Sequence, residues 1–306
     1  MSSSRDLNPP SIPYLIQWCK SLFAIQPPPP ADLDLTGQMG IITGGNRGLG
    51  FQCADILLGY KISHLIITVR NEKSGNDAVA ELKKLHPKAN VEAWSLDMES
   101  YDSIQKFVKR CADLARIDFV ILNAGIQTSE FVVSERTGHE LVFQVNYLST
   151  VLLTFLLLPI LKRTKNITGK PSRVTIAGSG LAFMAKFPEQ GVNPIIPAFD
   201  EKPANWGQSV AVDRYSTTKL MLLMFIDKLR NHVAQDEVVV NVGDPGFVGA
   251  TGFDRDIVGP VGFILSLSRR VVGRNIRAGA WTMVDAAVVK PATSHGSWTY
   301  NWQVYW

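Results

Sequence analysis

The chain has 306 residues, of which 46% are hydrophobic and 19% are charged, and its formal net charge is +4. This length and apolar content suit one large domain with a sizeable core, with two domains as the less favoured alternative. No basic run is longer than a pair, so nucleic acid is not expected as a partner. Cys19, Cys53 and Cys111 lie far apart and form neither a metal motif nor a disulfide framework, which suits a reducing compartment.

Residues 1–33 are predicted to form an N-terminal extension. Apolar residues recur at helical spacing over residues 12–25, and residues 27–30 are four prolines, so a short helix and a stiff spacer are expected. The favoured interpretation packs this helix on the domain, and the alternative is an interfacial helix that touches a membrane or lines a substrate entrance. No signal peptide is visible, and the longest apolar run, residues 151–161, is far short of the ~20 residues of a membrane span. A cytoplasmic protein is therefore expected.

Residues 34–306 are predicted to be a single α/β domain. Short apolar strands alternate with longer amphipathic segments, which indicates right-handed βαβ units, a doubly wound parallel sheet and helices on both faces. Two long connections, residues 180–213 and 249–273, follow carboxyl ends of strands, where open α/β sheets bind ligands, and are interpreted as substrate lids. The expected strands are residues 40–43, 64–69, 91–96, 117–122, 173–177 and 238–242, and the expected helices include 77–85, 102–114, 135–162 and 214–230.

A glycine-rich loop follows the first expected strand. Gly44, Gly48 and Gly50 stand between that strand and a helix. Glycines let the backbone turn tightly and approach a pyrophosphate closely, and the helix N-terminus supplies free N–H groups. A simple tight turn is the alternative, but the position in a βαβ unit favours a phosphate site.

Tyr215 and Lys219 are four residues apart in an expected helix, so their side chains share one face. A cation that close favours the phenolate and lowers the pKa of the tyrosine from its usual ~10. Such a phenol can give a proton to a carbonyl or take one from an alcohol. Alone, this spacing is typical of a solvated helix face, so its interpretation depends on the motifs upstream.

These motifs together resemble the short-chain dehydrogenase/reductase family over residues 36–300. The resemblance implies a Rossmann-type fold. The tail at residues 294–296 and the long connection before Tyr215 resemble the family's retinol-dehydrogenase-like branch, and with the Pro-rich lead they look most like reductases of fungal natural-product pathways. The motifs, in the family's order, are Thr43-Gly-x-x-x-Gly-x-Gly50, Asn123-Ala124-Gly125, Asn146, Ser179, Tyr215 with Lys219, and Pro245-Gly246.

The resemblance implies a catalytic tetrad of Ser179, Tyr215, Lys219 and Asn146. In it, Ser179 hydrogen-bonds the substrate carbonyl and Tyr215 donates the proton. Lys219 lowers the tyrosine pKa and holds the nicotinamide ribose, while Asn146 positions a water in a proton relay. The family often has Ser-Ser where this chain has Gly178-Ser179, so Ser179 is the only candidate there.

The expected cofactor is NADP(H), with no metal. The second strand ends at Arg70. If an acidic residue stood there instead, it would bind the adenosine ribose and repel a 2′-phosphate. Arg47 and Arg70 instead present two guanidinium groups suited to that phosphate. An extra residue separates Val248 from Thr251 relative to the family, which leaves the Thr251 contact open. The resemblance assigns the cofactor to Thr43, Gly44, Asn46, Arg47, Gly48, Leu49, Gly50, Arg70, Asp97 and Met98, with Asp97 on the adenine amino group, and to Asn123, Ala124, Gly125, Tyr215, Lys219, Pro245, Gly246, Val248 and Thr251.

The leading hypothesis is an NADPH-dependent reductase of a ketone, or dehydrogenase of the matching alcohol, on a bulky apolar substrate. A non-redox enzyme on the same scaffold, such as an isomerase, dehydratase or pericyclic catalyst, and a cofactor-binding regulator are the alternatives. Homo-oligomer formation is left open. Aromatic and apolar side chains of the two long connections are candidates for the pocket or for the core, namely Phe183, Met184, Phe187, Trp206, Phe247, Phe253 and Phe263.

Overall fold

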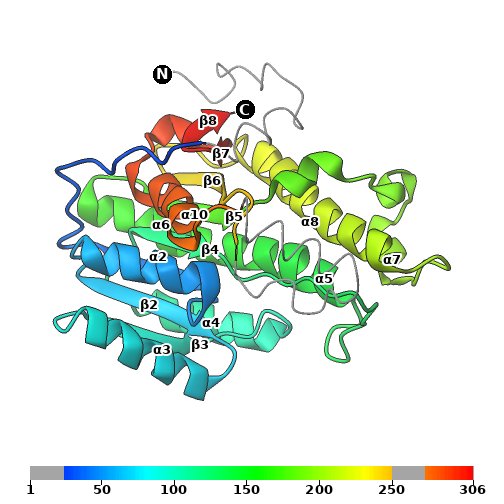
Figure 1. The fold of residues 1–306 in the computed structure, drawn as a ribbon, viewed down its shortest axis with the longest axis horizontal. Helices are drawn as coiled ribbons and strands as arrows, with labels where there is room; N and C mark the ends of the chain where they lie inside the picture. Colours follow the sequence, from blue (N-terminus) through cyan, green and yellow to red (C-terminus); the bar gives the residue numbers. More distant parts are fainter. Residues whose placement is uncertain (1–23, 250–272, 306) are drawn as a thin grey trace.

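The computed structural model describes residues 24–249 and 273–305, and these form a central sheet covered by helices on both faces (Figure 1). The strands lie in the order β3-β2-β1-β4-β5-β6-β7-β8, and every neighbouring pair is parallel except β7 with β8. The strands are β1 (Met39–Thr43), β2 (His64–Val69), β3 (Val91–Ser95), β4 (Phe119–Leu122), β5 (Ser172–Ala177), β6 (Val238–Asp244), β7 (Trp298–Tyr300) and β8 (Gln303–Tyr305).

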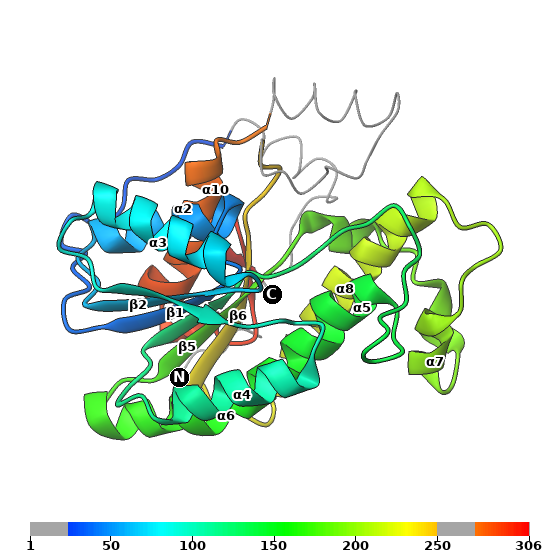
Figure 2. The ribbon, with the colours of Figure 1, turned by 90° about the horizontal axis from the view of Figure 1, so that it is seen from below.

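The helices make two layers, which Figure 2 shows edge-on. Helices α2, α3 and α10 cover one face of the sheet, and α4, α6 and α8 cover the other. This arrangement confirms the predicted doubly wound α/β fold. The α-helices are α2 (Gly48–Gly59), α3 (Glu72–Leu85), α4 (Tyr101–Ala112), α5 (Leu141–Phe143), α6 (Ser149–Thr168), α7 (Ile195–Asp200), α8 (Gln208–Leu229) and α10 (Ile276–Val284).

Each face of the sheet has its own core because successive strand residues point to opposite sides. In β1, Ile41 packs with the α4, α6 and α8 side, while Ile42 packs with the α2, α3 and α10 side. Both are 0% exposed. Burying such a side chain stabilises the fold by roughly 1.5–3 kcal/mol. Leu35 joins the second core, so the chain is already part of this packing at residue 35.

The long helix predicted over residues 135–162 is wrong at both ends. Residues 134–139 make a turn, and the helical run starts at Leu141 because the Glu140 carboxylate accepts hydrogen bonds from the N–H groups of Val142 and Phe143. The run includes a π-helical turn, Gln144–Leu148, and continues to Thr168, beyond which Gly169 ends it in a left-handed conformation.

Helix α3 also begins earlier than predicted, at Glu72 rather than residue 77. The Asn71 side chain accepts a hydrogen bond from the N–H of Ser74, which is a typical N-cap. Gly75 obscures this first turn in the sequence pattern. A Cβ on Gly75 would lie 2.6 Å from Val69 Cγ2, so glycine lets the helix approach β2 closely.

The helical run Leu141–Thr168 is long and apolar enough to cross a membrane on length and composition alone. However, 61% of its most apolar window is buried inside the protein. Its residues Leu153, Leu157 and Leu161 belong to the core under the sheet. The predicted N-terminal helix lies almost entirely outside the described residues.

Candidate active site

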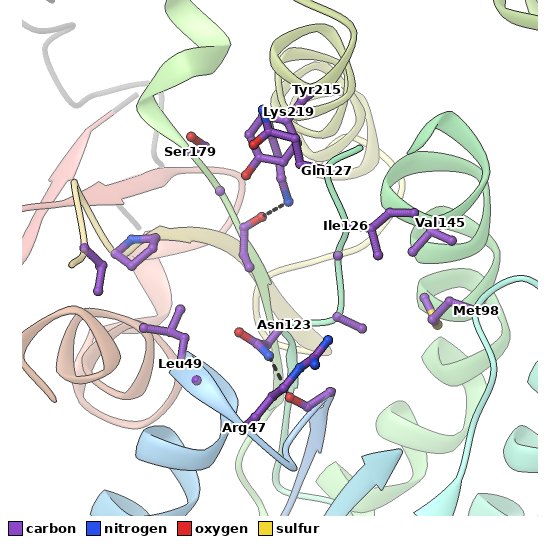
Figure 3. Close-up of a pocket in the computed structure, with 18 of the residues that line it drawn as sticks. Arg47, Leu49, Met98, Asn123, Ile126, Gln127, Val145, Ser179, Tyr215 and Lys219 are labelled. Carbon is purple, nitrogen blue, oxygen red and sulfur yellow. Dashed lines mark hydrogen bonds between the residues drawn. The ribbon is translucent and has the colours of Figure 1, made fainter. Parts of the chain in front are cut away.

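A cavity of about 650 Å³ opens at the carboxyl ends of β1, β4, β5 and β6 (Figure 3). It spans the junction of β1 and β4, where the chain switches from one half of the sheet to the other and where such folds bind ligands. Arg47 and Asn123 lie toward one end of the view, and Ser179, Tyr215 and Lys219 lie toward the other. The cavity therefore brings the glycine loop and the Tyr-x-x-x-Lys motif into one site.

The glycine loop makes a cradle at the N-terminus of α2. Gly44 and Gly48 have positive φ angles of 67° and 57°, which favour glycine. A Cβ on Gly50 would lie 2.4 Å from the carbonyl oxygen of Gly44, so no larger residue fits. Among the residues that the structure describes, no side chain caps the first turn of α2, and its Gly48 and Leu49 line the cavity. Free N–H groups at a helix N-terminus suit a phosphate group.

Hydrogen bonds of the Thr43 and Asn123 side chains hold this loop in place. The Asn123 side chain donates hydrogen bonds from Nδ2 to the carbonyl oxygens of Thr43 (3.0 Å) and Gly44 (3.2 Å). The Thr43 hydroxyl accepts one from the N–H of Ala124 at 2.9 Å. These bonds fasten the end of β1 to the end of β4. Asn123 and Ala124 line the cavity, whereas Thr43 is buried behind it.

Arg47 and Arg70 both line the cavity and are exposed. Two polar residues that sequence reasoning missed, Asn71 and Ser74, line the same cavity. The Asn46 side chain donates to the Ser74 hydroxyl at 3.2 Å. The missed signal was the Asn-x-x-Ser spacing, which marks the start of α3 directly after Arg70. This rim thus has two cations and polar groups that suit a phosphate.

Asp97 lines the cavity, but both of its carboxylate oxygens already have partners. Oδ1 accepts a hydrogen bond from the N–H of Glu99 at 3.1 Å, and Oδ2 accepts one from Arg136 Nη1 at 3.0 Å. The structure thus adds Arg136, which the sequence analysis did not consider, to the surroundings of Asp97. Met98 lies beside them in the cavity wall.

Tyr215 and Lys219 lie on one face of α8, where both are buried and both line the cavity. Lys219 Nζ lies 5.5 Å from the centre of the Tyr215 ring. It donates a hydrogen bond to the carbonyl oxygen of Ala177, at the end of β5, at 2.9 Å (Figure 3). Burial lowers the pKa of Lys219 to about 8, while the charge of Asp244 opposes that shift.

Asp244 is a further cavity residue that sequence reasoning did not single out. It ends β6 next to β5, one residue beyond the Ala177–Gly243 pair. Burial raises the pKa of its carboxyl to about 6, although a hydrogen bond from the N–H of Gly246 and the charges of Arg274 and Lys219 lower it. Its neighbours Pro245, Gly246 and Val248 also line the cavity. Thr251 lies outside the described residues.

Ser179 lines the cavity at the point where β5 gives way to a 3₁₀ turn, and its Oγ accepts a hydrogen bond from the N–H of Leu181. The glycine before it has a packing reason. A Cβ on Gly178 would lie 2.4 Å from Val242 Cγ1, so the Ser-Ser pair of the family pattern does not fit here.

Asn146 lies in the π-helical turn and is 1% exposed. Its Oδ1 accepts from the N–H of Ile126 at 2.8 Å, and its Nδ2 donates to the Ile126 carbonyl oxygen at 2.9 Å and contacts Thr218 Oγ1 at 3.4 Å. Asn146 therefore ties the segment after β4 to α8, beside Lys219. The contacts are with protein groups, and the water relay stays a prediction.

The aromatic residues of the first long connection pack on other aromatic rings and do not line the cavity. Phe187 packs with Phe143 and Phe199, whose rings are stacked 4.0 Å apart. Trp206 packs edge-on against Phe131, and Phe183 packs on Trp298. Among the described candidates only Phe247 lines the cavity. Gln127, Leu181 and Val212, which were not predicted, line it as well. Met184 is 61% exposed, and Phe253 and Phe263 lie outside the described residues.

Comparisons with known proteins agree with this geometry. The family model of the short chain dehydrogenases matches residues 38–185. The short chain dehydrogenase/reductase mfmJ of Annulohypoxylon moriforme is 42% identical over 308 residues, covering 100% of this chain and 88% of that protein. The short chain dehydrogenase virL of Hypocrea virens is 39% identical, covering 90% and 80%. The RhlG/NADP active-site complex of Pseudomonas aeruginosa shares the fold, with a TM-score of 0.60 and 23% identity, covering 84% of this chain and 91% of that chain.

Proposed function

Because the chain belongs to the short chain dehydrogenase family, we propose that it is an NADPH-dependent oxidoreductase that reduces a ketone, or oxidises the matching alcohol, on a bulky apolar substrate. The observation that carries this proposal is the shared cavity of the glycine cradle and the buried Tyr215–Lys219 pair. A site for a dinucleotide at one end and a proton donor at the other is what carbonyl reduction needs.

The cradle fits a dinucleotide phosphate, because Gly44, Gly48 and Gly50 leave space that side chains would fill. Arg47 and Arg70 would hold the 2′-phosphate, and Asn71 and Ser74 would add polar groups. Asp97 and Met98 would flank the adenine, and Asn123 to Gly125 would lie beneath the adenosine. Lys219 and the segment Pro245–Val248 would hold the nicotinamide end. The bound cofactor would supply the hydride.

The chain's own residues would manage the proton. Ser179 would donate a hydrogen bond to the carbonyl oxygen and polarise it. As the carbonyl carbon gains the hydride, the oxygen would take the proton of the Tyr215 hydroxyl, and the phenolate would regain a proton from solvent. The Lys219 ammonium, held by the Ala177 carbonyl, places a positive charge beside the ring where negative charge develops.

The substrate end of the cavity supports an apolar substrate. Leu181, Val212 and Phe247 are apolar residues of the cavity lining, and Gln127 adds one amide. Pockets of this kind use apolar walls for affinity and a few polar groups for orientation. A natural-product pathway is suggested by the relatives from Annulohypoxylon moriforme and Hypocrea virens, both fungi. The retinol-dehydrogenase-like branch stays a prediction from the sequence.

The direct test follows NADPH absorbance with a panel of bulky ketones and identifies the products. We expect NADPH consumption with formation of the secondary alcohol. Product formation without any change in NADPH would favour a non-redox enzyme instead. Cofactor binding with no product from any substrate class would favour the regulator.

Replacing Asp244 by Asn should shift the alkaline limb of the rate profile to lower pH. The Asp244 charge raises the pKa of Lys219, which burial lowers to about 8, so its loss lets that pKa fall further. The ammonium is then lost at a lower pH. Asn keeps the oxygen that accepts from the N–H of Gly246. The measurement is kcat/KM for ketone reduction against pH.

The matched control is Asp285→Asn, which removes another buried carboxylate, paired with Lys290 at 2.7 Å and absent from the cavity lining. Its profile should superimpose on that of the unmodified protein. Superimposable profiles for Asp244→Asn as well would show that Asp244 does not act on Lys219.

The N-terminal extension should dock on the domain rather than on a membrane. Residues 12–25 have an apolar stripe that must be buried against something, yet Lys20 is their only basic residue, which gives little attraction to anionic lipid. The measurement is liposome co-sedimentation of the full chain and of a chain starting at Ala31. We expect neither to sediment. Lipid binding by the full chain alone, with equal activity of both, would favour the membrane interpretation over a cytoplasmic enzyme.

A further inference from the structure

The C-terminal hairpin of β7 and β8 continues the sheet beyond β6, beside the end of the strand that leads into the cavity (Figure 1). The sequence motifs assign no task to it. Its turn is made by Asn301 and Trp302, and one arginine, Arg274, connects that turn to the segment Pro245–Gly249.

Arg274 holds the segment after β6 with both its side chain and its backbone. Nη1 donates a hydrogen bond to the carbonyl oxygen of Pro245 at 3.1 Å. The Arg274 N–H donates to the carbonyl oxygen of Phe247 at 2.7 Å, and its carbonyl oxygen accepts from the N–H of Gly249 at 3.0 Å. Three bonds from one residue thus bracket the segment that contributes Pro245 to Val248 to the cavity wall.

The other side of the guanidinium group rests on the hairpin turn. Nη2 donates to Asn301 Oδ1 at 2.6 Å, and the guanidinium carbon lies 4.5 Å from the centre of the Trp302 ring. Hydrogen bonding along the edge and stacking on the face use the planar shape of arginine, which lysine lacks.

The hairpin turn has an unusual backbone conformation, and its Trp302 ring belongs to the core on the side of α2 and α10. Asn301 and Trp302 have positive φ angles of 49° and 59°. Two-residue turns with two positive φ angles favour Asn-Gly, and a bulky side chain in the second position is uncommon. The Trp302 ring is nevertheless kept there, 6% exposed, under the guanidinium group. Strain of this kind persists where the surrounding structure and function require it.

Gly246 completes the arrangement. Its φ angle is 75°, and a Cβ built on it would lie 2.9 Å from Arg274 Nη1, so the guanidinium group occupies the space of a side chain. The N–H of Gly246 is held by Asp244 Oδ1. The Pro245–Gly246 backbone is therefore fixed by Asp244 on one side and by Arg274 on the other.

We propose that Arg274, Asn301 and Trp302 form a latch through which the C-terminal hairpin positions the Pro245–Val248 wall for the nicotinamide half of NADPH. This inference rests on the proposed function. Arg274 is a positioning residue, because its contacts within the described part of the chain are with the wall and the hairpin turn, and it does not line the cavity. The adenosine half of the cofactor would be held at the opposite end of the cavity, by Arg47, Arg70 and their neighbours.

This division predicts that latch variants separate two ligands. Adenosine 2′,5′-bisphosphate carries the adenosine and the 2′-phosphate but no nicotinamide. Arg274→Lys, Arg274→Met and Trp302→Gly should each weaken NADPH binding on the order of tenfold. This corresponds to a loss of about 1.4 kcal/mol, which is typical of one lost hydrogen bond. The affinity for adenosine 2′,5′-bisphosphate should not change. Trp302→Gly is informative because glycine suits the positive φ angle and removes only the ring.

The measurement is calorimetric titration of both ligands into each variant, with thermal unfolding as a check of folding. Arg277→Met is the matched control. Arg277 is also near the start of α10, but its guanidinium group pairs with Asp55 and is 58% exposed. The control should bind both ligands like the unmodified protein.

Unchanged NADPH affinity in the latch variants would overturn the proposal. Equal weakening of both ligands would overturn it as well, because it would indicate a general loss of structure. If the unmodified protein bound neither ligand, the proposed function itself would fail, and the latch would have nothing to position. If Arg274→Met did not fold, Arg274→Lys and Trp302→Gly would still decide between these outcomes.

Discussion

Replacing Tyr215 by Phe should leave NADPH binding nearly intact and reduce ketone turnover by about 10²–10⁴-fold, the usual contribution of a positioned acid or base. The change removes one oxygen from a ring that is 7% exposed, so packing is kept while the proton donor is lost. Lys219 remains bound to the carbonyl oxygen of Ala177. The measurements are kcat with a physiological ketone and the Kd of NADPH.

Tyr147→Phe is the matched control for this loss. Tyr147 is a half-buried tyrosine that stacks on Phe143 at 5.6 Å, but it does not line the cavity. Its variant should turn over at the native rate. A native rate for Tyr215→Phe as well would refute the redox mechanism and place a non-redox reaction first.

The part of the fold up to β6 was predictable because its signals are local. Short apolar strands alternate with amphipathic helices, and this period alone indicates a doubly wound parallel sheet. The C-terminal strands β7 and β8 escaped because each has only three residues, too few for a periodic pattern. Their place in the sheet depends on pairing with β6, which is distant in sequence.

The start of the helical run at Leu141 was not predicted, because its N-cap is a glutamate. Glutamate is not among the common N-cap residues, so Glu140 gave no recognisable signal. Its carboxylate nevertheless accepts two backbone N–H groups in a fully buried position. Such a cap is stable only in its tertiary context, which a single sequence does not display.

The candidate site divides in the same way. The positions of the glycine loop and of Tyr215 with Lys219 followed from spacing within one element. Asp244 and Arg274 could not be recognised, because their importance comes from neighbours far away in sequence, such as Lys219 and Trp302. The aromatic residues of the first long connection were ambiguous for a related reason. A phenylalanine in a long loop fills either a pocket or a core, and Phe187 and Phe199 fill a core.

One connection joins both ends of the site. Asn123 and Ala124 fasten the segment after β4 to the glycine loop. Ile126, two residues further along this segment, is held by Asn146, which also contacts Thr218 of α8. A Cβ on Gly125, between these points, would lie 3.2 Å from Asn146 Oδ1. The strand end therefore sets the distance between the phosphate cradle and Lys219. This bracing accounts for a buried asparagine whose amide binds backbone groups on both of its polar atoms.

Replacing both Arg47 and Arg70 by Ala should remove the preference for NADPH over NADH. Both side chains are exposed at the rim of the cavity, and no acidic residue ends β2. Charge-assisted hydrogen bonds to a phosphate contribute about 1.5–3 kcal/mol each. Because both arginines are exposed, the lower end of this range applies, so the NADPH affinity should fall by roughly 10²-fold while the NADH affinity hardly changes.

The exposure of the two arginines adds a second signature to this prediction. Exposed charges are screened by salt, so in the unmodified protein the ratio of the two cofactor affinities should shrink as the salt concentration rises, whereas in the double variant it should stay flat. The measurement is the Kd of NADPH and of NADH for each protein at low and high salt. Arg163→Ala removes an exposed arginine that binds the carbonyl oxygen of Ala112 and is absent from the cavity lining, so it should keep the native ratio. Comparable affinities for the two cofactors in the unmodified protein would show that Arg47 and Arg70 do not select the 2′-phosphate, and the cofactor assignment would then have to be abandoned.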